Sequence, residues 1–213
     1  MVSKSEVVMV TRLTRAERTE RVRADLLVAA RRTFLSRGFH QASLEEIALA
    51  AGWSKGAVFS NFAGKDELFL AVLDDQNRRR RREQIAEMQV APTLAEALLA
   101  AGREMAGAHE RDPQWTPLLV EFWTHASRDD ALRARVSAAH EDLLDGYAAV
   151  VAELAARDGL EFTAPVKAVC RSAAALARGL ALERLLDPGA VPEPDFGELF
   201  CAHILSRTRR VEP

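Results

Sequence analysis

The spacing of apolar residues predicts helices from the start of the chain. Between residues 15 and 37, apolar side chains recur every four positions, beginning with Val22 and Leu26. This period places them on one face of a helix. Thr14 has the residue type and position of an N-cap, and Gly38 is placed to end the helix.

Two shorter helices are predicted directly afterwards. Ser43 and Glu46 have the spacing of a capping box, which opens a helix over residues 44–51. Gly52 ends this helix, and a third short helix covers residues 55–62. A glycine turn between two such short helices is typical of a helix-turn-helix.

The remaining chain also favours helices, because Ala, Leu, Arg and Glu dominate and strand-like alternation is scarce. All eight prolines lie after residue 91, and Pro117 suits a first helical position. The further helices span approximately residues 65–88, 94–110, 117–127, 130–157, 165–186 and 195–207. The prediction is an all-α fold of about nine helices.

Composition and charge narrow the class of protein. The chain of 213 residues is 48% hydrophobic and 28% charged, which is enough to bury a core. Two cysteines are too few for a disulfide framework, and no segment has the length of a secretory signal or membrane span. We therefore expect a cytoplasmic protein without membrane contact. Residues 1–90 carry a net charge of +4 and the remainder −6, which predicts an anion-binding module on a larger acidic body.

The helix-turn-helix pattern suits DNA, because a short second helix fits the major groove. Hydroxyl and ammonium donors around it, such as Ser43 and Lys65, suit phosphates, while Ser60 and Asn61 can reach base edges. Small residues at the start of the third helix allow close approach to the groove. The alternative is a helical hairpin that serves only for packing.

The stretch LVAARRTFLSRGFHQASLEEIALAAGWSKGAVFSNFAGKDELFLAVL, residues 27–73, closely resembles the DNA-binding domain of tetracycline-repressor (TetR) type regulators. The residues that carry the resemblance are Phe34, Gly38, Phe39, Ser43, Ile47, Ala48, Ala51, Gly52, Ser54, Lys55, Gly56, Phe62, Lys65 and Leu68. The resemblance implies a DNA-binding domain over residues 1–64 and a ligand-binding, dimerising body over residues 65–213. It weakens beyond Asp75.

Two residues depart from the family pattern. Phe59 stands where tyrosine is usual, so that an apolar contact with a thymine methyl or a sugar replaces a hydroxyl contact. Trp53 stands in the turn where a small aliphatic residue is common, and we expect it to pack on the first helix. The residues expected to contact DNA are Ser43, Ser54, Lys55, Gly56, Ala57, Phe59, Ser60, Asn61 and Lys65.

Three features of the body bear on its function. The run Arg78–Arg82 begins about 20 Å along a helix from Lys65, so we expect a solvated or salt-bridged face rather than a DNA contact. The residues expected to bind a ligand are Trp115, Phe122, His125 and Tyr147, although they also suit an ordinary core. The small residues expected at a dimer interface are Ala173, Ala177 and Ala181, with an internal core as the alternative.

An enzyme is not expected. The spacings of Glu121 with His125 and of Glu104 with His109 do not match a helical di-iron site, and no nucleophile elbow, Walker loop or zinc-protease motif occurs. We therefore predict no metal and no cofactor.

Together these features predict a ligand-responsive transcriptional repressor. It would bind double-stranded, palindromic operator DNA as a homodimer and be released by a small-molecule inducer. A ligand-independent activator or architectural DNA-binding dimer is the alternative. The sequence names neither the operator nor the inducer nor the regulated genes.

Overall fold

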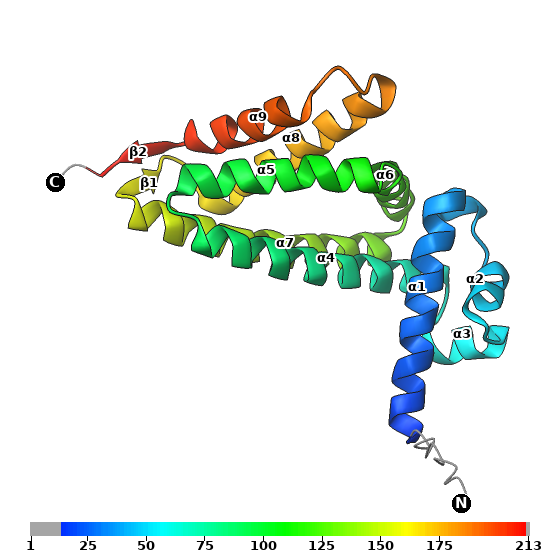
Figure 1. Ribbon diagram of the computed structural model, residues 1–213. Helices are drawn as coiled ribbons and strands as arrows, with labels where there is room; N and C mark the ends of the chain where they lie inside the picture. Colours follow the sequence, from blue (N-terminus) through cyan, green and yellow to red (C-terminus); the bar gives the residue numbers. More distant parts are fainter. Residues whose placement is uncertain (1–13, 212–213) are drawn as a thin grey trace, which may run out of the picture.

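The computed structural model describes residues 14–211, and within them the chain is all-α with nine helices (Figure 1). The helices are α1 (Arg15–Gln41), α2 (Leu44–Ala51), α3 (Lys55–Asn61), α4 (Lys65–Val90), α5 (Leu94–Arg111), α6 (Trp115–Ala126), α7 (Asp130–Arg157), α8 (Val166–Leu186) and α9 (Glu193–Leu205). Helices α4 to α9 form an elongated bundle, and α1 to α3 lie at one end of it, with α1 running across that end (Figure 1). None of the helices in residues 14–211 combines the length and the apolar character needed to cross a bilayer.

Local signals define the first three helices. Thr14 and Ser43 both form capping boxes, and Ser54 caps α3 by accepting the N–H of Ala57. Gly52 adopts φ 73° and ends α2, as predicted. Gly38 adopts φ 75° and breaks α1, but one further turn continues to Gln41 after the break. The glycine therefore produces a kink rather than the end of the helix.

The hydrophobic core around α1 to α3 does not stop at residue 64. The buried residues of α1 to α3 form one cluster with the first half of α4, with α6 and with the start of α7. Its centre is aromatic: the ring centroids of Phe34 and Phe69 are 5.1 Å apart, and those of Phe69 and Phe122 are 4.1 Å apart. Burial of such rings contributes strongly to the stability of this end. It also packs α6 directly against α1 and α4.

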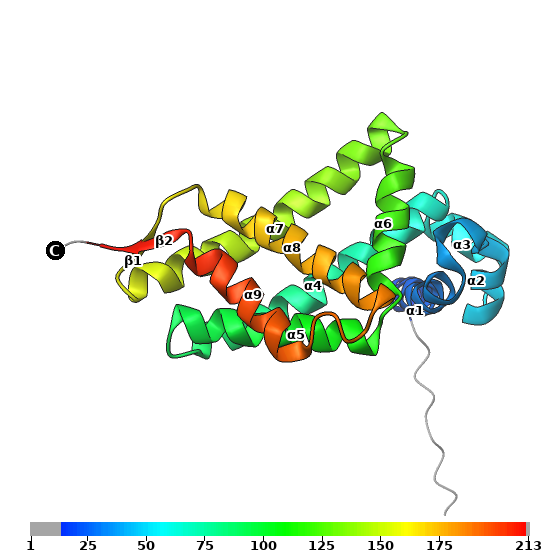
Figure 2. The ribbon, with the colours of Figure 1, turned by 90° about the horizontal axis from the view of Figure 1, so that it is seen from above.

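A second core cluster joins α4, α5, α7, α8 and α9 in the body. Helices α5 and α9 approach closely because glycines face each other: a Cβ on Gly102 would lie 2.8 Å from the Cα of Gly197. Figure 2 shows α8 and α9 side by side across one face of the bundle. Their outward face has no neighbour within the described chain.

Some element boundaries differ from the prediction. Helix α6 begins at Trp115, so Pro117 is its third residue, and α9 begins at Glu193 rather than near Asp195. Two short antiparallel strands, β1 (Leu160–Phe162) and β2 (Thr208–Arg210), were not predicted. Three residues are too few to show an alternating pattern, and the pairing joins segments almost fifty positions apart.

Candidate functional site

Helix α3 presents an exposed face beside the Gly52 turn. Val58 and Phe62 are buried and fix the helix against the core, whereas Lys55, Gly56, Phe59 and Ser60 are exposed. Half of the Phe59 side chain is accessible, which is unusual for so large an apolar residue. This exposed face has the dimensions and composition that suit a major groove.

The polar side chains of α3 are partly engaged within the protein. The Asn61 amide donates to the carbonyl of Ala57 (2.8 Å), and Ser60 donates its hydroxyl to the same carbonyl (2.9 Å). Lys55 pairs with Glu45 across the turn, while its Nζ lies 5.7 Å from the centre of the Phe59 ring. Phe59 and Lys55 therefore dominate the face, and Asn61 must turn away from its own helix to reach a base.

Two residues expected to bind phosphate also have structural roles. Lys65 Nζ donates to the carbonyls of His40 (3.0 Å) and Ala42 (3.2 Å), and thereby caps the end of α1. Ser43 accepts the N–H of Glu46 (3.2 Å). Lys65 keeps one donor for DNA, so a phosphate contact and the cap are compatible.

Basic residues on α1 were not among the residues expected to contact DNA. Arg15, Arg18, Arg21 and Arg23 are exposed near the start of α1, and Figure 1 shows that the start of α1 extends past α3. Arg23 lies over the ring of Phe62, 4.5 Å from its centre, and donates to the carbonyl of Asn61 (3.4 Å). The available signal was the presence of four arginines within the first nine residues of α1. They add positive charge to the start of α1.

Trp53 packs as predicted. Its indole N–H donates to Asp25 of α1 (3.2 Å), and the ring lies against the core of the first three helices. The residue therefore fixes the angle of the turn on α1.

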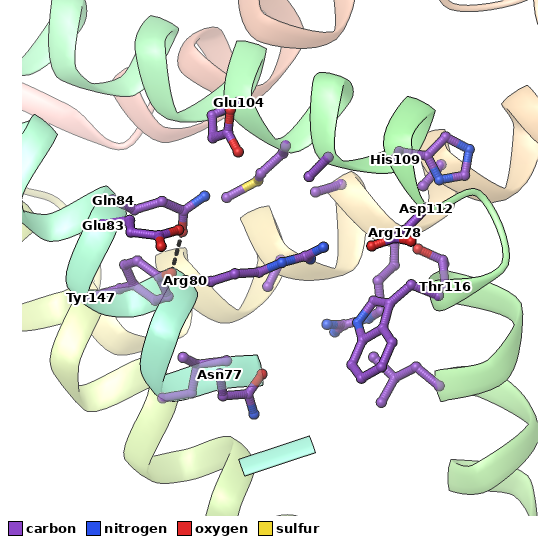
Figure 3. Close-up of a pocket in the computed structure, with 18 of the residues that line it drawn as sticks. Asn77, Arg80, Glu83, Gln84, Glu104, His109, Asp112, Thr116, Tyr147 and Arg178 are labelled. Atoms are coloured by element: carbon purple, nitrogen blue, oxygen red, sulfur yellow. Dashed lines mark hydrogen bonds between the residues drawn. The ribbon is translucent and has the colours of Figure 1, made fainter. Parts of the chain in front are cut away.

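A cavity of about 330 Å³ lies in the body between α4 and α8, with walls from α5, α6, α7 and α9 (Figure 3). Of the four residues predicted to bind a ligand, Trp115 and Tyr147 line it. The Tyr147 hydroxyl donates to Gln84, and burial raises the pKa of Tyr147 to about 12. Tyr147 is therefore a neutral donor at physiological pH. The cavity has the size and the mixed lining of small-molecule sites.

The other two predicted ligand residues do not line this cavity. Phe122 is fully buried between Phe39 and Phe69, and His125 Nε2 lies 3.1 Å from Asp66 Oδ1. Ten residues of helix separate Trp115 from His125, which corresponds to about 15 Å. The start of α6 therefore faces the cavity, and its end packs against α1 and α4.

Glu121 joins these two parts of the molecule. Its carboxylate accepts the backbone N–H groups of Phe39 (3.0 Å) and His40 (2.9 Å), directly after the Gly38 kink. A Cβ at Gly38 would lie 2.9 Å from Glu121 Oε2, so only glycine leaves room for this contact. The carboxylate of α6 thus holds the last turn of α1 in place.

The small residues expected at a dimer interface face inward. Ala173 and Ala181 are buried within the single chain, and Ala177 lines the cavity. The stripe of small residues packs against α5, α7 and α9 rather than against a partner, so the internal-core alternative holds for them. The opposite face of α8 exposes Ala175 and Gly179, and nothing lies within 4 Å of a Cβ built on Gly179.

No group of three or more His, Cys, Asp or Glu residues within 14–211 is arranged to hold a metal ion. Glu121 contacts the backbone of α1, and His125 contacts Asp66 of α4.

The chain is similar in sequence to known bacterial regulatory proteins. Residues 26–72 match the bacterial regulatory proteins of the tetR family, and residues 92–209 match the C-terminal part of BetI-type transcriptional repressors. The chain is 49% identical over 59 residues to the HTH-type transcriptional activator FasR of Mycolicibacterium smegmatis, which covers 28% of this chain and 26% of FasR. It is 32% identical over 124 residues to the HTH-type transcriptional repressor AcnR of Corynebacterium efficiens, which covers 58% of this chain and 60% of AcnR. The chain thus spans less than two thirds of either relative.

A solved structure of a TetR-family transcriptional regulator from Mesorhizobium loti has the same fold, with a TM-score of 0.72 at 20% identity over 93% of this chain and 100% of that one. The BetI-type match alone covers more than half of the chain. The protein therefore belongs to the tetR family of bacterial regulatory proteins, and its helix-turn-helix, α2 and α3, lies in the segment that matches the tetR family model.

Proposed function

We propose that the protein is a ligand-responsive transcriptional repressor that binds a palindromic operator as a homodimer. In this proposal residues 1–64 form the DNA-binding domain and residues 65–213 the ligand-binding and dimerisation body. A small molecule in the cavity releases the protein from DNA. The observation that carries the proposal is the position of α6, which contributes to both regions.

Helix α6 supports a direct mechanical link. Trp115 and Leu119 line the cavity, while Glu121 holds the kinked end of α1 two residues further along. A ligand that displaces the start of α6 also moves Glu121, because a helix of twelve residues moves largely as a rigid element. The orientation of α1, and with it that of α3, follows.

The exposed face of α8 and α9 supports the dimer. Ala175 and Gly179 leave room for a partner helix, and Leu186 and Leu199 expose 86% and 47% of their surface. Two copies that pair through this face would place two α3 helices on the same side of DNA. Half-sites are read one helical turn apart, about 34–36 Å, so a shift of a few ångströms prevents simultaneous docking.

The mechanism requires different ligand affinities in the two conformations. The inducer binds more tightly to the conformation in which the α3 spacing no longer matches the half-sites. By linkage, the operator then weakens ligand binding by the same factor as the ligand weakens operator binding, typically about 5- to 150-fold.

A gel shift on the DNA directly upstream of the protein's own gene tests DNA binding, and calorimetry of a ligand with and without that DNA tests the coupling. Equal ligand affinity in both titrations would contradict the inducer role. Loss of repression on addition of the ligand in an in vitro transcription assay would support it.

The alternative is a ligand-independent activator or architectural dimer. The name of FasR, an activator that matches the DNA-binding segment, favours keeping activation as the second candidate. The same transcription assay separates the two, because an activator raises transcript yield from the bound promoter and a repressor lowers it.

A further inference from the structure

Two arginines enter the ligand cavity from opposite walls. Arg80 belongs to α4 and Arg178 to α8, and both line the cavity. Figure 3 shows Arg80 extending across the cavity from the side of Tyr147 towards Asp112. Within residues 14–211, no carboxylate forms an ion pair with Arg80 or Arg178. Arg80 belongs to the run Arg78–Arg82, which was expected to lie on a solvated or salt-bridged face, but its side chain lines the cavity.

The acidic residues of the cavity do not neutralise these two charges. Glu104 pairs with Arg111 (2.5 Å), and Asp112 pairs with Arg31. Glu83 and Glu87 also line the cavity and are exposed to solvent. Arg178 therefore has no fixed counter-charge, and Arg80 shares the charge of Asp112 with Arg31. A partly buried charge without a full partner is costly, and an anionic ligand in the cavity would supply the missing counter-charge.

Both guanidinium groups are held in place by uncharged neighbours. The Gln76 amide lies beside the Arg80 guanidinium; its oxygen accepts from Arg31 and Arg79 (3.3 Å each) in one orientation, and from Arg80 Nε (2.8 Å) and Nη2 (3.1 Å) when the amide is turned over. Arg178 lies over the ring of Trp123, 4.6 Å from its centre. Burial lowers the pKa of Arg80 and of Arg178, but an arginine starts so far above neutrality that both remain charged. These contacts orient the charges without neutralising them.

An apolar slot continues from the charged cavity. It measures about 90 Å³ and shares Tyr147, Leu143 and Arg178 with the larger cavity. The slot extends between aliphatic and aromatic side chains of α5, α7 and α9, including Leu98 and Phe200. A ligand that filled both spaces would place one polar end near the arginines and an apolar tail in the slot.

We propose that this cavity takes an amphipathic organic anion, with a carboxylate held by Arg80 and Arg178 and an aliphatic tail in the adjoining slot. The proposal deepens the proposed function, on which it rests for the role of the cavity. A guanidinium fork matches a carboxylate in geometry and in charge, and the pair is strongest where water is excluded.

Three probes that share a ten-carbon chain test the charge preference. The binding of decanoate, 1-decanol and decyltrimethylammonium is measured by calorimetry on the whole protein without DNA. We expect decanoate to bind at least about tenfold more tightly than the other two, because each charge-assisted hydrogen bond is worth about that factor. Equal affinity for the alcohol, tighter binding of the cation, or no saturable binding of decanoate at millimolar concentration overturns the proposal.

Variants assign the effect to the arginines. Arg80→Met and Arg178→Met keep the length of the side chain but remove the charge, and each should weaken decanoate roughly ten- to a hundredfold while leaving 1-decanol unchanged. Arg82→Met is the matched control, since Arg82 is exposed on the same helix and does not line the cavity. The melting temperature of ligand-free Arg178→Met should be unchanged or higher, because an unpaired charge is removed. A lower melting temperature together with unchanged decanoate affinity would give Arg178 a purely structural role and overturn its assignment.

The outcome for this ligand class can be separated from the outcome for the proposed function. Decanoate that binds through the arginines but leaves the operator complex intact in a gel shift upholds the ligand class and contradicts the inducer role. Release of the operator by decyltrimethylammonium, without decanoate binding, upholds the inducer role and overturns the ligand class.

Discussion

The contact between Glu121 and the kinked end of α1 allows a quantitative prediction. Glu121→Gln leaves one carbonyl oxygen where the carboxylate has two, and its amide nitrogen then faces a backbone N–H. One of the two bonds to Phe39 and His40 is lost, and the other becomes neutral. A hydrogen bond to a charged group contributes about 1.5–3 kcal/mol.

Because 31% of the Glu121 side chain is exposed, water replaces part of the lost interaction. We therefore expect the lower end of this range, a loss of about 1.5–2 kcal/mol in the free energy of unfolding. For a chain of this size the melting temperature should fall by roughly 3–8 °C.

Urea and thermal unfolding, followed by circular dichroism at equal protomer concentration, measure this loss. Glu153→Gln is the matched control, since Glu153 is exposed on α7, and its effect should stay within about 0.5 kcal/mol. If Glu121→Gln were as stable as Glu153→Gln, the carboxylate would not hold the kink. Under the proposed function, Glu121→Gln should also keep ligand affinity while reducing the ligand effect on operator binding.

Three further predictions follow from other contacts. Lys65→Met removes the cap on the carbonyl of His40, so it should lower the free energy of unfolding by about 1–2 kcal/mol in urea. It should also weaken binding to all DNA sequences in a gel shift, and a change in DNA binding alone would exclude the cap. Gly179→Glu places a charge on the outward face of α8 without any clash inside the chain, so sedimentation should show folded monomers, and an intact dimer would place the interface elsewhere. Hydrogen bonds from Lys167 and Arg171 lower the pKa of Glu141 to about 2. The stability that these bonds give the native state is therefore complete above pH 4.5 and is lost as the pH falls towards 2. NMR titration should show this midpoint and Lys167→Met should raise it, whereas an unchanged midpoint in the variant would contradict the pairing.

The sequence by itself determined the helices and the turn. Thr14, Ser43 and Gly52 act through contacts three or four residues away, so their residue types and spacing are enough to predict the caps and the helix-turn-helix. The absence of proline before residue 91 and the period of the apolar stripes act at the same short range. For this reason the all-α class and most helix boundaries could be predicted.

Only the tertiary structure decided what each helix face meets. Helical periodicity shows that Ala173 and Ala177 share a face, but not whether a partner or the chain's own core covers it. It places Trp115 and Phe122 on one helix. It does not show that Trp115 lines the cavity while Phe122 packs against α1 and α4. It could not show that Arg80 and Arg178, almost one hundred residues apart, enter one cavity. These outcomes depend on contacts between distant segments, which are set by the packing of all nine helices together and leave no local pattern in the sequence.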